Sequence, residues 1–196
     1  MKSFFTLFLI LFFSSSVVAD DISDFEIEGI SIGNSLLDYF SEKEIIDEIK
    51  INKYMYEYTT AEFGEVYKYD GLQTYFMTSF FVKPEDKNFI IYAIYGTLPH
   101  ENNINNCYQK MNEISKEFII IFKSAKQLDQ NYNHPVDPSG RSKVKTSYFM
   151  FNNGDEIDIM CIDFEENLRL KNNWSDGLSI SIGRKEFNDW LKKRIN

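Results

Sequence analysis

The part of the sequence richest in groups that could do chemistry is the segment from His134 to Ser142. It holds an imidazole (His134), a carboxylate (Asp137) and two hydroxyls (Ser139 and Ser142) in one short stretch. A serine hydroxyl becomes a nucleophile when a base lies within hydrogen-bond distance and oriented donors stabilise the oxyanion. The segment is therefore a candidate catalytic loop of a hydrolase.

The same segment also has the composition of a turn. The Gly-x-Ser-x-Gly pattern that presents the nucleophile of many hydrolases is not present in it. The run Asp137-Pro138-Ser139-Gly140 has the residues that a β-turn prefers, with Asp first, Pro second and Gly fourth. The sequence favours the turn, and the catalytic loop is the alternative.

A second candidate site is a group of tyrosines. Tyr54, Tyr56 and Tyr58 alternate with other residues, as on one face of a strand, and Tyr67 and Tyr69 follow. Tyrosine suits binding surfaces because its ring is apolar and its hydroxyl is polar. The simpler interpretation is that these rings pack under helices.

The chain has two cysteines, Cys107 and Cys161. Cys107 lies in the apolar stripe of a predicted helix, and Cys161 lies among apolar residues of a predicted strand. A helix that packs on a sheet brings two such faces together. In an exported protein this pair indicates a disulfide, and in a reducing compartment two buried thiols are the alternative.

Patterns for metals and cofactors are weak. Neither His100 nor His134 belongs to a recognised metal-ligand spacing, and the chain has no Cys-x-x-Cys pair and no Gly-rich phosphate loop. The oxygen-rich run from Asn152 to Glu156 lacks the EF-hand spacing, and a hairpin turn accounts for it. The sequence predicts no metal and no cofactor.

The first nineteen residues have the form of an export signal. Lys2 precedes an apolar run that is too short to anchor the chain in a membrane, and small residues end at Ala19. We expect cleavage before Asp20 and an exported protein, either periplasmic or secreted. No later apolar run reaches membrane-spanning length.

Residues 20–196 are expected to form a single domain. The whole chain has 21 basic and 30 acidic residues and a net charge of −9, and loss of the signal segment removes only a lysine from that balance. An acidic chain is poorly suited to nucleic acid or to anionic lipid, both of which attract basic patches. The partner we expect is an envelope protein or a small molecule.

Periodicity predicts the elements that position these residues. A long amphipathic helix is predicted at 103–126, because apolar residues recur at intervals of three and four. Asn153-Gly154 predicts a hairpin, and loops are predicted at 127–142 and 165–177. The other predicted elements are a strand at 25–30, short helices at 34–40 and 41–49, strands at 54–60, 63–69, 73–82, 88–97, 143–151, 156–164 and 178–182, and a terminal helix at 185–194.

This order predicts an α+β fold: a largely antiparallel sheet of several hairpins covered by one long helix, with short N-terminal helices and a C-terminal helix. The strand that contains Ile90 to Tyr95 is apolar on both faces, so it is expected to be central in the sheet.

The combination DFEIEGISIGNSLLDYFSEKEI, YDGLQTYF, DPSGRS, MCIDF and FNDWL resembles a family of small exported proteins of marine alphaproteobacteria. The resemblance covers nearly the whole mature chain. It implies a signal peptide and one cysteine pair, and it implies no activity. Gly29 to Gly33 before a short helix is also similar to the helix entry of outer-membrane assembly lipoproteins and of β-lactamase-inhibitor-like domains. The lipid-anchor cysteine of those lipoproteins is not present, so no function is carried over.

The sequence as a whole favours an exported, non-enzymatic binding or interaction module. The alternative is a hydrolase that uses the 134–142 loop.

Overall fold

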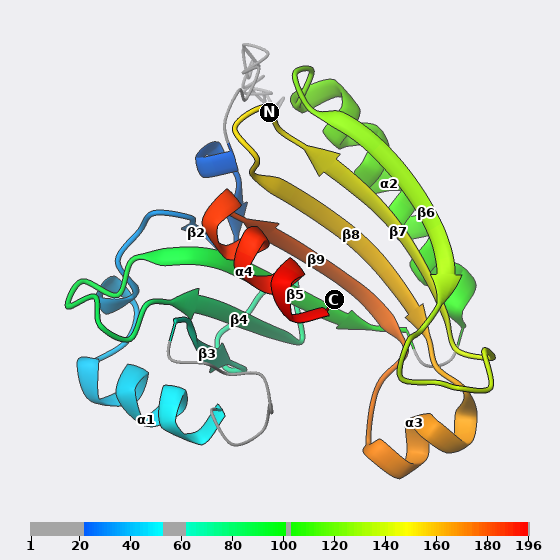
Figure 1. Cartoon of the computed structure of the whole chain (residues 1–196), viewed down its shortest axis with the longest axis horizontal. Coiled ribbons are helices and arrows are strands. Elements are labelled where there is room, and N and C mark those ends of the chain that lie inside the picture. Colours follow the sequence, from blue (N-terminus) through cyan, green and yellow to red (C-terminus); the bar gives the residue numbers. More distant parts are fainter. Residues whose placement is uncertain (1–21, 53–61, 101–102, 196) are drawn as a thin grey trace, which may run out of the picture.

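The structure is a computed structural model that describes residues 22–52, 62–100 and 103–195. Its main element is a seven-stranded antiparallel sheet with the strand order β3-β4-β5-β9-β8-β7-β6, and β1 and β2 form a separate two-stranded sheet (Figure 1). The predicted α+β class with a largely antiparallel sheet is confirmed. The strands are β1 (Glu26–Ile27), β2 (Ile30–Ser31), β3 (Gly64–Lys68), β4 (Met77–Val82), β5 (Ile91–Pro99), β6 (Lys126–Asn133), β7 (Lys143–Met150), β8 (Glu156–Asp163) and β9 (Gly177–Gly183).

The sheet consists of two meanders that meet where β5 pairs with β9. The strand predicted to be central is β5, which lies between β4 and β9. The predicted hairpin at Asn153-Gly154 is also confirmed, since β7 and β8 pair antiparallel across that turn. The helices are η1 (Ile22–Asp24), η2 (Leu36–Asp38), α1 (Glu42–Asn52), α2 (Ile104–Ile121), α3 (Glu166–Asn172) and α4 (Lys185–Ile195).

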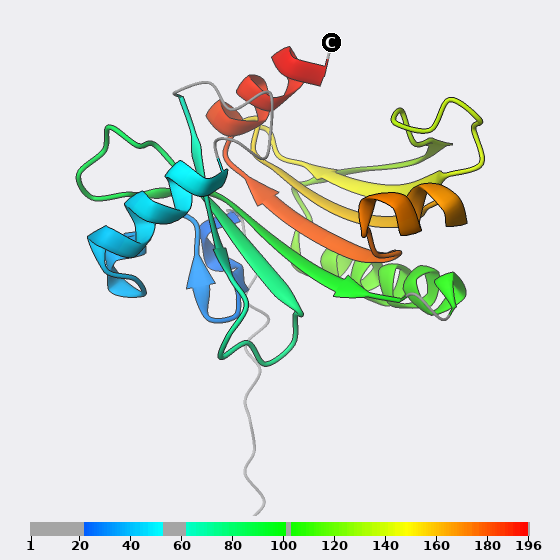
Figure 2. The same cartoon turned by 90° about the horizontal axis from the view of Figure 1, so that it is seen from below.

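The long helix α2 packs on one face of the sheet, against β7, β8 and β9 (Figure 2). Its buried stripe includes Cys107, Met111 and Phe118, and the stripe meets the inward side chains of the strands. Cys107 is joined to Cys161 of β8 by a disulfide with the two Cα atoms 6.0 Å apart. The predicted cysteine pairing is therefore confirmed.

The N-terminal elements complete this side of the core. Ile27 and Ile30 of the small β1–β2 sheet are buried in the same apolar cluster as α2. The Phe25 ring packs edge-on against Phe118, with the ring centroids 5.0 Å apart. The long helix therefore does not cover this face of the sheet alone. It lies over β7, β8 and β9, and the N-terminal segment extends the same layer.

Helix α4 lies on the opposite face of the sheet (Figure 2). A separate apolar cluster forms beneath it from Phe63, Ala93, Phe187 and Trp190. The two helices thus bury the two faces of the sheet unequally, since the larger apolar cluster lies on the α2 side.

Two predicted loops are wrong in part. The first half of the segment 127–142 is strand β6, which pairs with β7 from Lys126 to Asn133. It looks like a loop in the sequence because most of its side chains are polar and exposed at the edge of the sheet. The segment 165–177 contains helix α3, which Glu165 caps by accepting a hydrogen bond from the Leu168 N–H.

Other predicted elements also differ from the structure: β4 begins at Met77 rather than at 73, and β5 begins at Ile91 rather than at 88. The long helix ends at Ile121 rather than 126, because Lys126 already pairs with Met150 in the sheet. The strand predicted at 25–30 is instead a tight hairpin, whose turn places Glu28 and Gly29 at positive φ. The short helix predicted at 34–40 is the single 3-10 turn η2. Among the described residues, no helix is both long and apolar enough to cross a membrane.

We predict that the double change Cys107→Ala and Cys161→Ala lowers the free energy of unfolding by about 4 kcal/mol, because it frees a loop of 54 residues in the unfolded chain. Denaturant unfolding measures this change. Mass spectrometry of the purified, unreduced protein is the companion test, since reduction should add two hydrogens. Two free thiols in the unreduced protein would contradict the bridge.

Candidate functional site

The predicted catalytic segment forms a loop between β6 and β7 that is organised by Asp137. The Asp137 carboxylate accepts hydrogen bonds from the Ser139 hydroxyl (2.6 Å), the Ser139 N–H (2.9 Å) and the Ser142 N–H (2.7 Å). These bonds, with that from the Ser139 hydroxyl foremost, hold the pKa of Asp137 well below its ordinary value. Asp137 therefore closes the loop as an ionised acceptor.

The histidine of this loop is placed differently. The His134 ring packs on Phe164, with the ring centroids 5.1 Å apart, and burial lowers its pKa. The Ser142 hydroxyl accepts a hydrogen bond from the Glu165 N–H at 2.9 Å. The structure thus brings all four candidate residues into one loop, but the hydrogen bonds described there join neither hydroxyl to the imidazole. The hydrolase stays a prediction.

The candidate tyrosines Tyr54, Tyr56 and Tyr58 lie outside the described residues. Tyr67 and Tyr69, which the sequence groups with them, stack with their ring centroids 6.0 Å apart at the β3 edge of the sheet. Only this second part of the predicted tyrosine surface is therefore placed.

The sheet face opposite α2 carries a row of polar and aromatic side chains, which we call the polar row. Cross-strand pairing sets its members opposite one another. Because successive side chains of a strand point to opposite faces, the neighbours of these residues along each strand point toward α2. The row consists of Tyr67, Ser79, Tyr95, Ser181, Asp158 and Tyr148, from β3 to β7.

Asp158 is the carboxylate of the polar row. It accepts a hydrogen bond from the Thr146 hydroxyl on the neighbouring strand. Burial raises the pKa of Asp158 to about 6, and this hydrogen bond offsets only part of the effect. Asp158 therefore changes charge in a range where an ordinary aspartate is fully ionised.

Glu65 of β3 is a second buried acid on the same face, with only 8% of its surface exposed. Burial raises the pKa of Glu65, although Ser79 and Tyr67 donate hydrogen bonds to it. Burial, together with the charges of Asp158 and Glu65, also raises the pKa of the Tyr95 phenol. The face thus holds phenols that stay protonated beside acids that resist ionisation.

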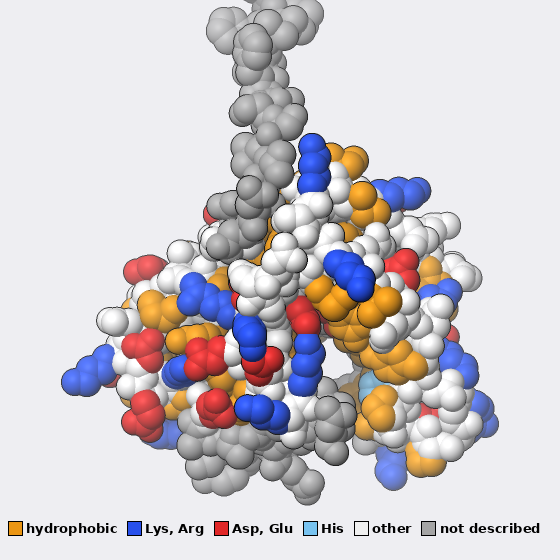
Figure 3. Space-filling view, turned by 45° about the horizontal axis from the view of Figure 1, so that its top comes forward, with side chains coloured by type: hydrophobic (Ala, Val, Ile, Leu, Met, Phe, Trp, Pro, Cys, Tyr) orange, Lys and Arg blue, Asp and Glu red, His pale blue; other side chains and the backbone are white. Residues whose placement is uncertain are grey.

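Figure 3 shows the molecule obliquely from its α4 side, and the surface in this view has a hollow. Hydrophobic side chains gather on one wall of the hollow, and charged side chains of both signs gather across from them. Concave surfaces that combine apolar walls with a few polar groups are typical of ligand sites. The polar row lies on this side of the sheet, and we treat it as one of two candidate sites.

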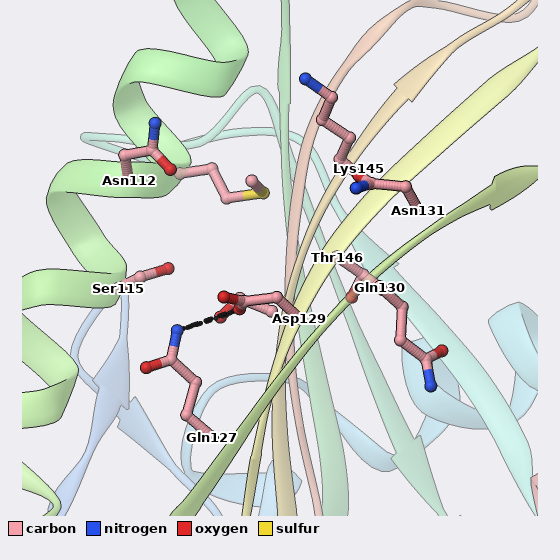
Figure 4. A pocket seen from close by; sticks show the side chains of 10 residues that line it. Asn112, Ser115, Gln127, Asp129, Gln130, Asn131, Lys145 and Thr146 are labelled. Atoms are coloured by element: carbon pink, nitrogen blue, oxygen red, sulfur yellow. Dashed lines mark hydrogen bonds between the residues drawn. The ribbon is translucent and has the colours of Figure 1, made fainter.

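The other candidate lies between α2 and the edge of the sheet, and we call it the α2–β6 cleft. It is a cavity of about 230 Å³ with a largely polar lining. Figure 4 shows Ser115 of α2 on one side and Gln127 and Asp129 of β6 on the other, directed into the space between them, whereas Gln130 points away from it. The lining residues are Met111, Asn112, Ser115, Gln127, Asp129, Gln130, Asn131, Lys145, Thr146 and Ser147.

Asp129 is the fixed carboxylate of this cleft. Its Oδ1 atom accepts hydrogen bonds from Gln127 Nε2 (2.9 Å) and from the Ser147 hydroxyl (2.7 Å). No described residue donates to Oδ2. The carboxylate is therefore oriented by the protein while one of its oxygens remains available to a ligand.

Ser115 faces Asp129 from the helix (Figure 4). The residue is only 7% exposed, and its hydroxyl has no hydrogen-bond partner among the described residues. An unsatisfied buried hydroxyl costs about 1–3 kcal/mol. A polar group that entered the cleft would remove this penalty, so Ser115 indicates a ligand.

The cleft continues along β6 into a second cavity of similar size. The two cavities share Asn131 and Lys145. The Lys145 ammonium lies 3.8 Å from the centre of the Tyr108 ring, as in a cation–π contact. The gap between α2 and β6 is thus an elongated groove rather than an isolated hole.

Sequence reasoning missed both candidate sites, although each left a signal. Asp158 is a charged residue between the apolar residues of a strand with a strand on either side, and it is half-buried. Ser115 stands one turn from Met111 and Phe118 on the apolar stripe of the helix. A polar residue at a core position is the informative exception in such a pattern.

Comparison of the chain with protein-family models, with characterised proteins and with solved structures finds no match. The functional argument therefore rests on the geometry of the sites. Within the described ranges, no group of three or more His, Cys, Asp or Glu side chains is placed to hold a metal ion.

We predict that Asp158→Asn changes how stability depends on pH. The folded state holds the Asp158 proton more tightly than the unfolded state does, so folding is favoured below the unfolded pKa and loses stability as pH rises toward 6. The free energy of unfolding of the variant, relative to the native protein, should rise by about 2 kcal/mol between pH 4.5 and 7.5. Denaturant unfolding at both pH values measures it.

The matched control is Asp70→Asn, since Asp70 is an exposed aspartate in the β3–β4 connection. Its difference from the native protein should stay nearly constant over the same range. An equally flat difference for Asp158→Asn would show that Asp158 ionises normally.

Proposed function

We propose that the protein is an exported, non-enzymatic binding module that takes a small polar ligand into the α2–β6 cleft. The observation that carries this proposal is the buried Ser115 hydroxyl, which lacks a partner and faces the cleft. Evolution rarely leaves such a group unsatisfied. A ligand group that forms a hydrogen bond with Ser115 would satisfy its buried hydroxyl and would explain why a polar residue occupies this position.

The chemistry of the lining defines the class of ligand. Asp129 offers an acceptor oxygen, Lys145 offers a cationic donor, and Asn112 and Asn131 offer amides that both donate and accept. A neutral molecule with several hydroxyl groups satisfies all of these at once, since each hydroxyl also donates and accepts. The ligand we propose is a small polyol or monosaccharide, in keeping with a cavity of about 230 Å³.

The predicted location fits this role. The disulfide between Cys107 and Cys161 is typical of oxidising compartments outside the cytoplasm. The predicted export signal at 1–19 lies outside the described residues, so a periplasmic or secreted location rests on the sequence together with this bridge. Membership of the exported family that the sequence resembles stays a prediction of the same kind.

The hydrolase alternative makes a separate prediction. Catalysis by the 134–142 loop would require the Ser139 or Ser142 hydroxyl to leave its present partner and approach His134. Ester-hydrolysing activity that Ser139→Ala or Ser142→Ala abolishes, while both variants unfold as the native protein does, would favour the alternative.

The proposed site is tested by Ser115→Ala. Removal of the unpaired hydroxyl should raise the free energy of unfolding of the unliganded protein by about 1 kcal/mol, since the buried penalty disappears and alanine favours the helix. The same change should weaken ligand binding about tenfold. Lys116→Ala, on the exposed side of α2, is the control for helix propensity.

Binding is measured by NMR titration of the exported protein with single monosaccharides, glycerol and simple amines at millimolar concentration. We expect a hydroxyl-rich compound to shift the amide signals of α2 and β6, and Asp129→Asn to weaken that response. If Ser115→Ala destabilises the unliganded protein and none of these compounds shifts those signals, the proposed site is wrong.

A further inference from the structure

Strand β6 forms one edge of the seven-stranded sheet. It pairs with β7 along all eight of its residues and without a register shift. Among the described residues, no strand pairs with its outer side. Edge strands are usually protected by proline, by bulges, by short length or by charged side chains, and of these β6 has only the charges of Lys126 and Asp129. A long regular edge of this kind is a template for another strand.

The pairing with β7 fixes which backbone groups of β6 point outward. The His134 N–H donates to the Ser142 carbonyl at 2.9 Å, in continuation of the β6–β7 register. Hydrogen-bonded pairs alternate along an antiparallel ladder, so the even-numbered residues of β6 bond to β7. The free N–H and C=O groups therefore belong to Gln127, Asp129, Asn131 and Asn133.

The side chains of β6 are divided between the two faces of the sheet. Leu128 and Tyr132 lie on the α4 side, where they are 40% and 39% exposed. Gln127, Asp129 and Asn131 lie on the α2 side and line the cleft. Any strand that pairs with β6 has to match an apolar face and a polar face in alternation.

We propose that the strand that pairs with β6 is β6 of a second copy of this chain, antiparallel and centred on Gln130. In this register each exposed Leu128 lies opposite Tyr132 of the other copy, so both apolar side chains are covered. The outward backbone groups also match, because Asp129 lies opposite Asn131 and Gln127 lies opposite Asn133. The sequence of β6 is thus complementary to itself.

Neighbouring registers lack this match. A pairing centred on Asp129 sets the two Asp129 carboxylates directly opposite each other, which is unfavourable. A pairing centred on Asn131 sets Leu128 opposite His134 and leaves Tyr132 opposite Gln130, so the apolar contact is lost. Complementarity therefore selects both the partner and the register.

Charge does not oppose the contact. The whole chain has a net charge of −9, but β6 carries one lysine and one aspartate. Lys143 and Lys145 stand on the adjacent strand β7. The β6 edge is thus a part of this acidic molecule where two copies can approach without net repulsion.

The dimer would also extend the proposed binding site. Asp129 lines the cleft of one copy, and Asn131 of the other copy would lie opposite it on the same face of the joined sheet. Each cleft would therefore gain polar groups from the second copy. The dimer itself rests on the strand edge and does not require that the cleft binds a ligand.

A cysteine introduced at the centre of the contact tests the register. The described native cysteines are bonded to each other, so Gln130→Cys would supply one free thiol per chain. Residue 130 of one copy would lie directly opposite residue 130 of the other, as a non-hydrogen-bonded pair. The short Cα separation of such a pair suits a disulfide. We expect Gln130→Cys to form a covalent dimer under mild oxidation. Tyr132→Cys is the matched control and should crosslink much more slowly.

Charge exchange provides the second measurement, by sedimentation equilibrium over a wide range of concentration. We expect the exported protein to dimerise reversibly, Leu128→Lys with Tyr132→Lys to be monomeric, and Leu128→Lys with Tyr132→Glu to recover the dimer. Circular dichroism confirms that each variant folds. A native protein that stays monomeric at millimolar concentration, or equal crosslinking of Gln130→Cys and Tyr132→Cys, would overturn the proposal.

Discussion

The packing of α2 on β7, β8 and β9 is the contact on which the rest of the structure depends. The helix presents a stripe with a period near 3.6 residues, the strands present every second residue, and the Cys107–Cys161 bridge joins the two. This contact decides which residues of each strand enter the larger apolar cluster. The alternate residues of these strands, together with their cross-strand neighbours on β3, β4 and β5, form the polar row on the other face.

Both candidate sites are consequences of that arrangement. On the α4 side, the smaller apolar cluster shares the sheet face with the half-buried Asp158 and the buried Glu65. On the α2 side, the helix contacts the inner strands, and Ser115 and Ser147 stand where larger apolar residues would close the gap toward β6. The α2–β6 cleft is thus an opening in an otherwise packed layer, and its polar lining distinguishes it from a packing defect.

The sequence predicts most of the architecture and little of the sites. Apolar patterning located α2 and β5, Asn153-Gly154 located the β7–β8 hairpin, and the predicted export indicated the cysteine bridge. Strand β6 escaped prediction because an edge strand with polar side chains lacks the apolar alternation that reveals inner strands. The candidate sites depend on how separate elements come together, as Ser115 of α2 and Asp129 of β6 do across the cleft, and no local pattern records this.

The central claim is that the α2–β6 cleft is a preformed site in which a ligand forms a hydrogen bond with the Ser115 hydroxyl. A crystal structure of the protein at high resolution tests it most directly. The account predicts an open cleft in which the Ser115 hydroxyl bonds to a bound molecule or an ordered water that also contacts Asp129. A Ser115 hydroxyl that bonds back to the Met111 carbonyl within the helix, with β6 closed onto α2, would contradict it.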